Sequence, residues 1–144
     1  MALRLDHANL AVHDVDAAIR FLQVALPEFR IRAEGIGWLG ARWVHVGTDD
    51  VYVALHQATK QPAEPWVPYA GQPGTNHLGF EVDDTDALRE RMLAAGYEDS
   101  SVRNAHPWRK RVYFHDEEGN DWEFVQYLSD DPALRNDYAI PDVT

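Results

Sequence analysis

Hydrophobic and polar residues alternate from the start of the chain, which predicts a β-strand over residues 3–12. In this strand His7 and Asn9 share one face, while Leu10 and Val12 share the other. The apolar face is suited to packing against a helix. The opposite face carries side chains that can bind a ligand or take part in a reaction.

A helix and three further strands are expected in the first half of the chain. Apolar residues recur at helical spacing over residues 14–26, with Asp14 as the predicted N-cap and Pro27 as the end of the helix. The predicted strands cover residues 29–33, 42–46 and 51–56, the last two joined by a hairpin turn at 47–50.

The same order of elements returns after a linker. Residues 58–75 contain four prolines and two glycines, a composition that excludes a helix or a central strand. A strand is then predicted over 76–82, a helix over 84–95, and a hairpin of strands over 111–116 and 121–127. The polar segment 129–144 is expected to be a surface tail or an arm that contacts a second subunit.

Identities between the halves support a duplication. At an offset of 70 residues His7 matches His77, and six further pairs match: Val12, Asp14, Asp16, Ala17, Ala25 and Glu28 with Val82, Asp84, Asp86, Ala87, Ala95 and Glu98. We therefore predict an α+β fold of two tandem βαβββ modules, about 1–57 and 76–128, in one domain spanning 1–144. Because each module leaves one sheet face open, the two are expected to form a cupped, barrel-like mixed sheet with the helices outside.

Composition excludes several classes of protein. Hydrophobic residues make up 45% and charged residues 26%, as in ordinary globular proteins. The formal charge of −11 argues against binding nucleic acid or an anionic membrane. Cysteine is absent, which excludes disulfides and thiolate chemistry. The sequence shows no signal peptide or membrane-spanning run, so we expect a cytoplasmic protein.

Two histidines and a glutamate occupy related positions on three predicted strands. His7 and His77 are repeat partners, and Glu123 lies within the apolar segment 122–125. A buried carboxylate needs a partner. That partner is either a divalent cation shared by all three side chains or an arginine, with the histidines hydrogen-bonded in the core. Their placement by the repeat favours the cation, for which two imidazoles and one carboxylate form a facial set with open coordination positions.

Other polar side chains share these strand faces. Asn9 and Glu81 are predicted to line the same cavity, Glu81 either as a base or at the rim. Arg111 shares a face with Tyr113 and could bind a substrate carboxylate or phosphonate bidentately. The alternative for Arg111 is a solvated basic loop that also contains Arg103, Arg109 and Lys110.

This pattern resembles the vicinal oxygen chelate superfamily, which includes glyoxalase I, fosfomycin-modifying thiol transferases, extradiol dioxygenases, epimerases and bleomycin-binding proteins. The resemblance runs from His7 through Asn76-His77-Leu-Gly to Gly119-Asn-Asp-Trp-Glu123. It implies that His7, His77 and Glu123 bind a metal, with Fe(II) or Mn(II) favoured and Zn(II) or Ni(II) as alternatives. It also implies a small, possibly anionic substrate and a homodimer.

One departure separates this chain from glyoxalase I, which has a fourth ligand, a glutamate, on the last strand of its first module. Ala54 stands at the matching place here and cannot coordinate a metal. His56 shares the face of Ala54 but lies at the end of the strand. Three protein ligands would leave positions for a bidentate substrate and for dioxygen.

A second resemblance is to the signature region of extradiol dioxygenases. The chain reads Asn104-Ala-His106, then Val112-Tyr113-Phe-His-Asp116, then Gly119 and Glu123, although the usual proline after the acidic residue is Glu117. The resemblance implies acid/base and oxygen-orienting roles for His106 and Tyr113. A surface-loop histidine is the alternative for His106, and the apolar-Tyr motif also occurs in other branches of the superfamily.

We therefore predict a metal-dependent enzyme that chelates a small substrate through vicinal oxygens, with oxygenolytic ring cleavage as the favoured reaction. The alternatives within the superfamily are a lyase, isomerase or epimerase, and a fosfomycin-type thiol transferase. The alternative of another class is a metal-free protein that binds a drug or metabolite, as bleomycin-binding relatives do.

Overall fold

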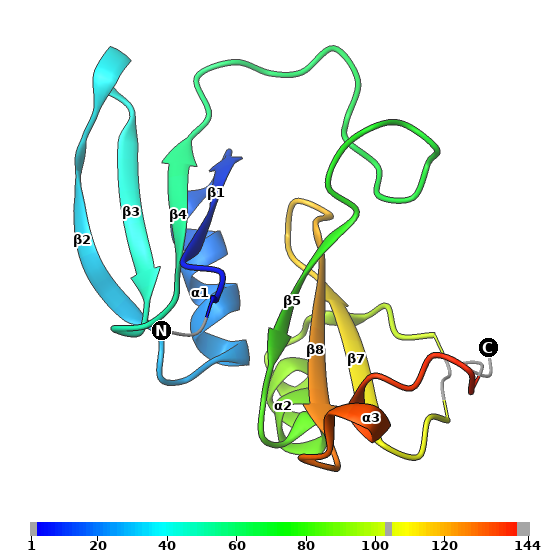
Figure 1. Ribbon diagram of the computed structural model, residues 1–144. Helices are drawn as coiled ribbons and strands as arrows, with labels where there is room; N and C mark the ends of the chain where they lie inside the picture. The colour runs from blue at the N-terminus through cyan, green and yellow to red at the C-terminus, as the bar shows by residue number, and fades with distance from the viewer. Residues whose placement is uncertain (1–2, 103–104, 141–144) are drawn as a thin grey trace. The chain divides into compact units, whose positions relative to one another are not determined.

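The computed structural model describes residues 3–102 and 105–140. The chain forms two compact units, Met1–Pro65 and Trp66–Thr144, and the boundary between them lies inside the proline-rich segment 58–75. Each unit has one four-stranded mixed sheet with a helix packed on it (Figure 1). The predicted α+β class is confirmed. The described residues form two separate sheets, so the predicted barrel-like sheet is not a closed barrel.

The sheet of the first unit has the strand order β1-β4-β3-β2. β1 (His7–Val12) runs parallel to β4 (Tyr52–Gln57), which is antiparallel to β3 (Arg42–Gly47), and β3 is antiparallel to β2 (Arg30–Ile36). A short 3-10 turn, η1 (Trp38–Gly40), joins β2 to β3. Because β1 and β4 are parallel, the chain must cross over between them, and α1 (Val15–Ala25) supplies most of that crossover.

Helix α1 is specified by its cap and its apolar stripe. Asp14 accepts a hydrogen bond from the backbone N–H of Ala17 at 2.9 Å, which confirms the predicted N-cap. Phe21 and Leu22 of this helix and Leu55 of the sheet are almost completely buried. Burial of each such side chain contributes about 1.5–3 kcal/mol. This layer holds the first unit together and leaves the other sheet face to polar side chains.

The second unit repeats this arrangement with the strand order β5-β8-β7-β6. Its elements are β5 (His77–Glu81), α2 (Thr85–Ala94), β6 (Glu98–Asp99), β7 (Arg109–His115), β8 (Asp121–Tyr127) and α3 (Pro132–Arg135). β5 is parallel to β8, and β8 is antiparallel to β7.

Helix α2 is attached to its sheet by both apolar and polar contacts. Asp84 caps it by accepting a hydrogen bond from Ala87 N–H at 2.9 Å. Leu88 and Met92 are buried. The buried Thr85 donates from both its backbone N–H and its hydroxyl to the side-chain oxygen of Gln126 on β8. These two hydrogen bonds fix the position of the start of α2 relative to β8.

Strand register makes the two units directly comparable. His7 pairs with Tyr52 in the first unit, and His77 pairs with Asp121 in the second. Two residues further along, Ala54 pairs with Asn9, and Glu123 pairs with the glycine at position 79. Ala54 therefore occupies the position in the first unit that Glu123 occupies in the second.

The predicted elements are observed with small changes in their ends. β1 begins at His7 rather than at residue 3, and Leu3 and Leu5 are exposed. Two short elements were not predicted, η1 and α3, while β6 is the third strand of the second βαβββ module, for which no position was predicted. None of the helices in the described ranges combines the length and the apolar character needed to cross a bilayer. The predicted basic and signature residues Arg103 and Asn104 lie outside the described residues.

Candidate functional site

Strands β5 and β8 bring two of the three predicted metal ligands together. His77 Nε2 lies 2.9 Å from Glu123 Oε2. The side chains are 33% and 15% exposed, so the carboxylate is largely shielded while the imidazole is reached from solvent. The sequence pattern anticipated this pair because strand alternation places both residues on the sheet face that α2 does not cover.

Tyr113 on β7 completes this group. Its hydroxyl is hydrogen-bonded to Glu123, and its ring lies edge-on to the His77 ring with centroids 5.7 Å apart. Burial, and then the hydrogen bond to Glu123, raise the pKa of Tyr113 well above its ordinary value of 10.0. The phenol is therefore protonated at neutral pH and acts there as a hydrogen-bond donor, not as a base.

Arg111, also on β7, lies beside the same carboxylate. Its Nε is 3.9 Å from Glu123 Oε1, whereas His77 approaches the other oxygen, Oε2. The sequence left an arginine as an alternative partner for Glu123. In the structure Glu123 lies near both Arg111 and His77. The guanidinium lies next to the histidine–carboxylate pair, where it is able to bind an anionic group.

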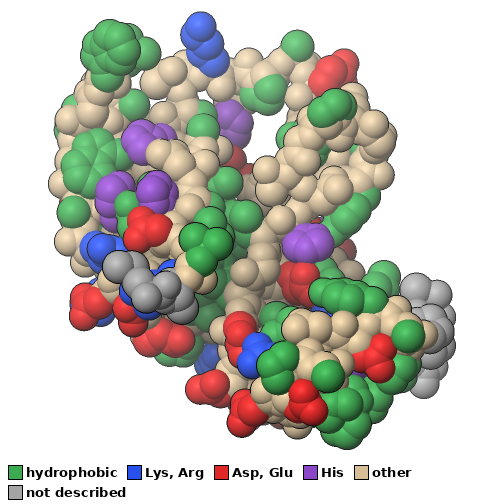
Figure 2. Space-filling model, in the orientation of Figure 1, with side chains coloured by type: hydrophobic (Ala, Val, Ile, Leu, Met, Phe, Trp, Pro, Cys, Tyr) green, Lys and Arg blue, Asp and Glu red, His purple; other side chains and the backbone are tan. Residues whose placement is uncertain are grey.

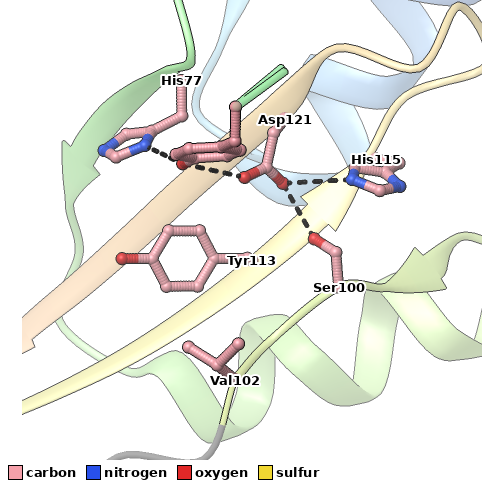
Figure 3. A pocket seen from close by; sticks show the side chains of 7 residues that line it. His77, Ser100, Val102, Tyr113, His115 and Asp121 are labelled. Atoms are coloured by element: carbon pink, nitrogen blue, oxygen red, sulfur yellow. Dashed lines mark hydrogen bonds and ion pairs between the residues drawn. The ribbon is translucent and has the colours of Figure 1, made fainter. Parts of the chain in front are cut away.

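A pocket of about 510 Å³ opens beside this group in the second unit (Figure 3). Its lining residues are Tyr69, His77, Ser100, Val102, Tyr113, His115 and Asp121. This volume lies within the range of pockets that hold small molecules. The pocket therefore places His77 and Tyr113 where a small ligand could reach them.

Asp121 organises the polar side of the pocket and is itself only 7% exposed. Ser100 donates a hydrogen bond to its Oδ1 at 2.8 Å, and His115 Nε2 lies 3.6 Å from the same oxygen. Tyr69 donates to its Oδ2 at 3.4 Å. Sequence reasoning gave no role to Asp121, His115 or Ser100, and it left Tyr69 either to cap the cleft or to pack against it. Alternation offered a signal for Asp121 and His115, which share strand faces with Glu123 and Tyr113, but none for Tyr69 or Ser100 in irregular segments.

His7 lies on the open face of the first unit within a group of aromatic and imidazole rings. Its Nδ1 is 2.7 Å from Asp6 Oδ2, and its ring stacks on Tyr52 at 4.6 Å. The Arg32 guanidinium lies over the same tyrosine, 4.2 Å from the ring centroid. Figure 2 shows several histidine side chains gathered on the surface of this unit. These contacts fix the orientation of His7.

Three further residues belong to this face of the first unit. The predicted cavity residue Asn9 has its Oδ1 3.0 Å from His56 Nδ1. His45 contacts both Trp43 and Tyr52. Burial, followed by the charge of Arg32, lowers the pKa of His45. In the strand register His45 stands at the place of Tyr113, and Ala54 stands at the place of Glu123.

The C-terminal segment engages Glu81 and His106. Arg135 Nη2 lies 3.0 Å from Glu81 Oε1 and the guanidinium stacks over Tyr127. His106 is buried, accepts a hydrogen bond from Trp108 N–H at 3.1 Å, and has its Nε2 3.0 Å from the backbone oxygen of Asp137. Both nitrogens of His106 are thus bound to backbone atoms. This favours a structural role, and its predicted catalytic role stays a prediction.

The complete ligand set has members in both units, His7 in the first and His77 with Glu123 in the second. Among residues 3–102 and 105–140, no group of three His, Asp or Glu side chains lies in an arrangement that could hold a metal ion. The structure brings His77 and Glu123 together, and the three-ligand site stays a prediction.

Comparisons with known proteins agree with this architecture. The model of the Glyoxalase/Bleomycin resistance protein/Dioxygenase superfamily matches residues 4–124. A crystal structure of a glyoxylase/bleomycin resistance protein/dioxygenase domain from Frankia sp. EAN1pec is similar, with 20% identity, a TM-score of 0.73, and coverage of 91% of this chain and 96% of that one. A glyoxalase family protein from Bacillus cereus has 18% identity and a TM-score of 0.71, covering 90% and 97%.

The fosfomycin resistance protein FosX from Listeria monocytogenes, crystallised with Mn(II) and a sulfate ion, is also similar. It has 17% identity and a TM-score of 0.62, with coverage of 88% of this chain and 93% of that one. A search of curated proteins gives no match. The family model spans most of the chain, and so this protein belongs to the glyoxalase/bleomycin resistance protein/dioxygenase superfamily.

Proposed function

We propose that this protein is a metal-dependent enzyme that binds a small substrate through two neighbouring oxygen atoms. In this proposal His7, His77 and Glu123 hold one divalent ion. The observation that carries it is the approach of His77 Nε2 to Glu123 Oε2 at 2.9 Å on a sheet face that borders a pocket. His7 comes from the first unit, either of the same chain or of a second copy in a homodimer.

The donor atoms fit such an ion. Ligand bonds of about 2.1 Å set roughly at right angles place neighbouring donor atoms about 3 Å apart, which agrees with the observed 2.9 Å. An imidazole nitrogen and a carboxylate oxygen suit Fe(II), Mn(II), Zn(II) or Ni(II). His7 has its Nδ1 held by Asp6, the kind of carboxylate partner that metal-binding histidines commonly have, which leaves its Nε2 as the donor.

We favour Fe(II) or Mn(II). The presence of Mn(II) in a FosX structure of the same fold supports this choice. When bound, the ion would polarise a substrate oxygen and stabilise negative charge that develops on it. A protonated Tyr113 donates a hydrogen bond at the same place, and Arg111 binds an anionic group of the substrate. Asn9 and Glu81 complete the substrate contacts in this proposal, and Glu81 then has to exchange its contact with Arg135.

Oxygenolytic ring cleavage is the reaction that we propose first. Ala54, at the position equivalent to Glu123, removes the fourth ligand of a glyoxalase site and leaves room for a bidentate substrate and dioxygen. The second candidate is modification of a phosphonate of the fosfomycin type. The similarity to FosX structures and the position of Arg111 beside Glu123 favour it.

The proposal is tested by metal analysis of protein purified without chelators. We expect about one divalent ion per chain, lost in His7→Ala, His77→Ala and Glu123→Ala and retained in His13→Ala, a matched control outside the site. Wild-type protein that cannot be loaded with Fe(II), Mn(II), Zn(II) or Ni(II) would exclude the enzyme proposed here. It would support the metal-free binding protein instead.

The reaction is tested on metal-loaded protein. Oxygen uptake with a panel of catechols supports ring cleavage if it disappears in Glu123→Ala. Consumption of fosfomycin in the presence of a thiol or water, without oxygen uptake, supports the second candidate. Inactivity in both assays with stoichiometric metal would contradict both reactions and leave the isomerase, lyase and epimerase branches.

A further inference from the structure

The proline-rich segment that follows the first sheet has an ordered conformation around Tyr69. Trp66 donates from Nε1 to the backbone oxygen of Thr75 at 3.0 Å, and its ring packs so closely on the glycine at position 74 that an added Cβ would lie 2.3 Å from a ring carbon. The N–H of Tyr69 donates to Asn76 Oδ1 at 2.8 Å. These contacts fix residues 66–76 against the start of β5.

Tyr69 itself adopts an uncommon backbone conformation. Its φ of 61° lies in the left-handed region, where bulky L residues are rare. Such a conformation persists when surrounding contacts enforce it, and it often marks a functional position. Here its effect is to direct the phenol into the pocket, although the residue as a whole is 58% exposed.

The Tyr69 hydroxyl links His77 to Asp121. It is in hydrogen-bond contact with His77 Nδ1, and it donates to Asp121 Oδ2 at 3.4 Å. Figure 3 shows His77 and Asp121 on the same side of the pocket. A phenol has a single proton. If that proton is donated to the Asp121 carboxylate, the phenol oxygen must accept a hydrogen bond from His77, which places the imidazole hydrogen on Nδ1.

The position of this hydrogen determines whether His77 Nε2 faces Glu123 with a lone pair or with an N–H. With its hydrogen on Nδ1, a neutral imidazole has its lone pair on Nε2, and Nε2 lies 2.9 Å from Glu123 Oε2. Two acceptors at that distance repel each other unless a cation lies between or beside them. In the reverse arrangement, Tyr69 donates to Nδ1 and an Nε2–H donates to Glu123, so that the lone pair needed for a metal is unavailable.

We propose that Tyr69 and Asp121 are positioning residues that hold His77 with its hydrogen on Nδ1, so that Nε2 is the metal ligand. The proposal rests on the metal site proposed above. It assigns a function to segment 66–76, which carries the phenol that completes the outer contacts of the site. Asp121 is buried, and its Oδ1 accepts a hydrogen bond from Ser100. These contacts fix the carboxylate to which Tyr69 donates.

The first measurement is metal affinity of the full-length protein, by titration with Co(II) against a competing chelator. Tyr69→Phe removes the hydroxyl and keeps the ring, and we expect its affinity to fall by about 10- to 100-fold, the range seen when such outer partners are removed. Asp121→Ala should lose a similar factor, and Asp121→Asn, which still accepts a hydrogen bond, should lose less. Tyr138→Phe, the same substitution at an exposed tyrosine outside the pocket, should bind as the wild type does.

The second measurement is NMR of the Co(II)-loaded protein, in which the N–H proton of a coordinated imidazole is shifted far from the other resonances. In the wild type we expect a His77 Nδ1–H signal that exchanges slowly with water, and in Tyr69→Phe we expect it to exchange rapidly or vanish. A purely structural contribution of Tyr69 would lower the melting temperature without selectively exposing this proton.

The outcomes separate the two proposals. Co(II) binding that is lost in His77→Ala but unchanged in Tyr69→Phe, with a slowly exchanging Nδ1–H in both, would overturn this inference and leave the metal site intact. No Co(II) binding by the wild type would overturn the metal site and the inference with it. Coordination through Nδ1 would likewise contradict the inference.

Discussion

Glu123 is the residue on which the candidate site depends, and its surroundings combine three kinds of contact. His77 approaches one oxygen at 2.9 Å, Arg111 lies 3.9 Å from the other, and Tyr113 is hydrogen-bonded to the carboxylate. Removing Glu123 would therefore affect both the proposed metal site and the pKa of Tyr113. The first prediction uses this coupling.

We predict that Tyr113 stays protonated well beyond the pH at which exposed tyrosines ionise, near pH 10. Burial and the hydrogen bond to Glu123 raise its pKa, so the folded state retains this proton more strongly than the unfolded state. The contribution of this raised pKa to the free energy of unfolding is thus fully present below pH 10 and is lost as the pH rises above it. Phenolate absorbance during an alkaline titration, compared between wild type and Tyr113→Phe, measures this ionisation.

The control for this titration is Glu123→Gln, which removes the negative charge but keeps an amide at the same place. The pKa of Tyr113 should then fall toward its ordinary value, while the part caused by burial remains. A normal titration of Tyr113 in the wild type, with no change in Glu123→Gln, would contradict the environment described for it.

At the residue scale, the sequence predicted His77, Tyr113 and Glu123 on regular strands but missed Asp121 and His115 on the same strands. It also gave no signal for Ser100 in an irregular segment. Strand alternation alone put His77 and Glu123 on one face. Tyr69 and Ser100 lie where no periodicity exists, and their positions depend on tertiary contacts such as that between Trp66 and residues 74 and 75. His106 had a suggestive motif, but its contacts with the backbone of Trp108 and Asp137 depend on how the C-terminal segment folds back.

At the element scale, the hairpin of β3 and β4 is closely packed where β3 ends. An added Cβ on the glycine at position 47 would lie 2.2 Å from the backbone oxygen of Val51 and 2.5 Å from Cα of Tyr52. Backbone atoms have little room to move away. The turn therefore requires a glycine for close approach of the two strands.

We predict that Gly47→Ala destabilises the protein by about 1–3 kcal/mol, the usual cost of overpacking. Urea or thermal unfolding followed by circular dichroism measures it. Gly79→Ala is the control, because its added Cβ would lie 3.6 Å from the nearest atom of Glu123, an ordinary contact. Equal stability of Gly47→Ala and wild type would show that the hairpin is looser than described.

The long elements were predictable because their periodicity, caps and breakers agree, as Asp14 with Pro27 illustrates for α1. The short ones were not. β6 has two residues, and its pairing with β7 defines it more than its own sequence does. α3 has four residues, too few for a helical period, although Asp131 before Pro132 is an N-cap signal that could have been used.

At the scale of the whole molecule, the duplication gives each unit the same framework but different chemistry. The first unit has His7 among aromatic and imidazole rings, and the second has the histidine–carboxylate pair with the pocket. A three-ligand site therefore needs both units. The two units can come from one chain or from two chains of a homodimer. These two arrangements predict different metal binding when two variants of the protein are mixed.

The last prediction distinguishes the two by mixing His7→Ala with Glu123→Ala protein after partial unfolding and refolding together. If each site combines the first unit of one chain with the second unit of its partner, a mixed dimer has one intact site and one doubly altered site. Random association makes about half of the dimers mixed, so about a quarter of the wild-type metal content should return. Each variant refolded alone should bind little metal.

Recovery of this metal would mean that each site combines the first unit of one chain with the second unit of its partner. Light scattering on the mixture establishes that dimers are present, and refolding of Glu123→Ala with Glu123→Gln controls for recovery that does not come from complementary units. Dimers without recovered metal would mean that His7 and Glu123 of one site belong to the same chain. Monomeric protein with stoichiometric metal would lead to the same conclusion, because a single chain then supplies all three ligands.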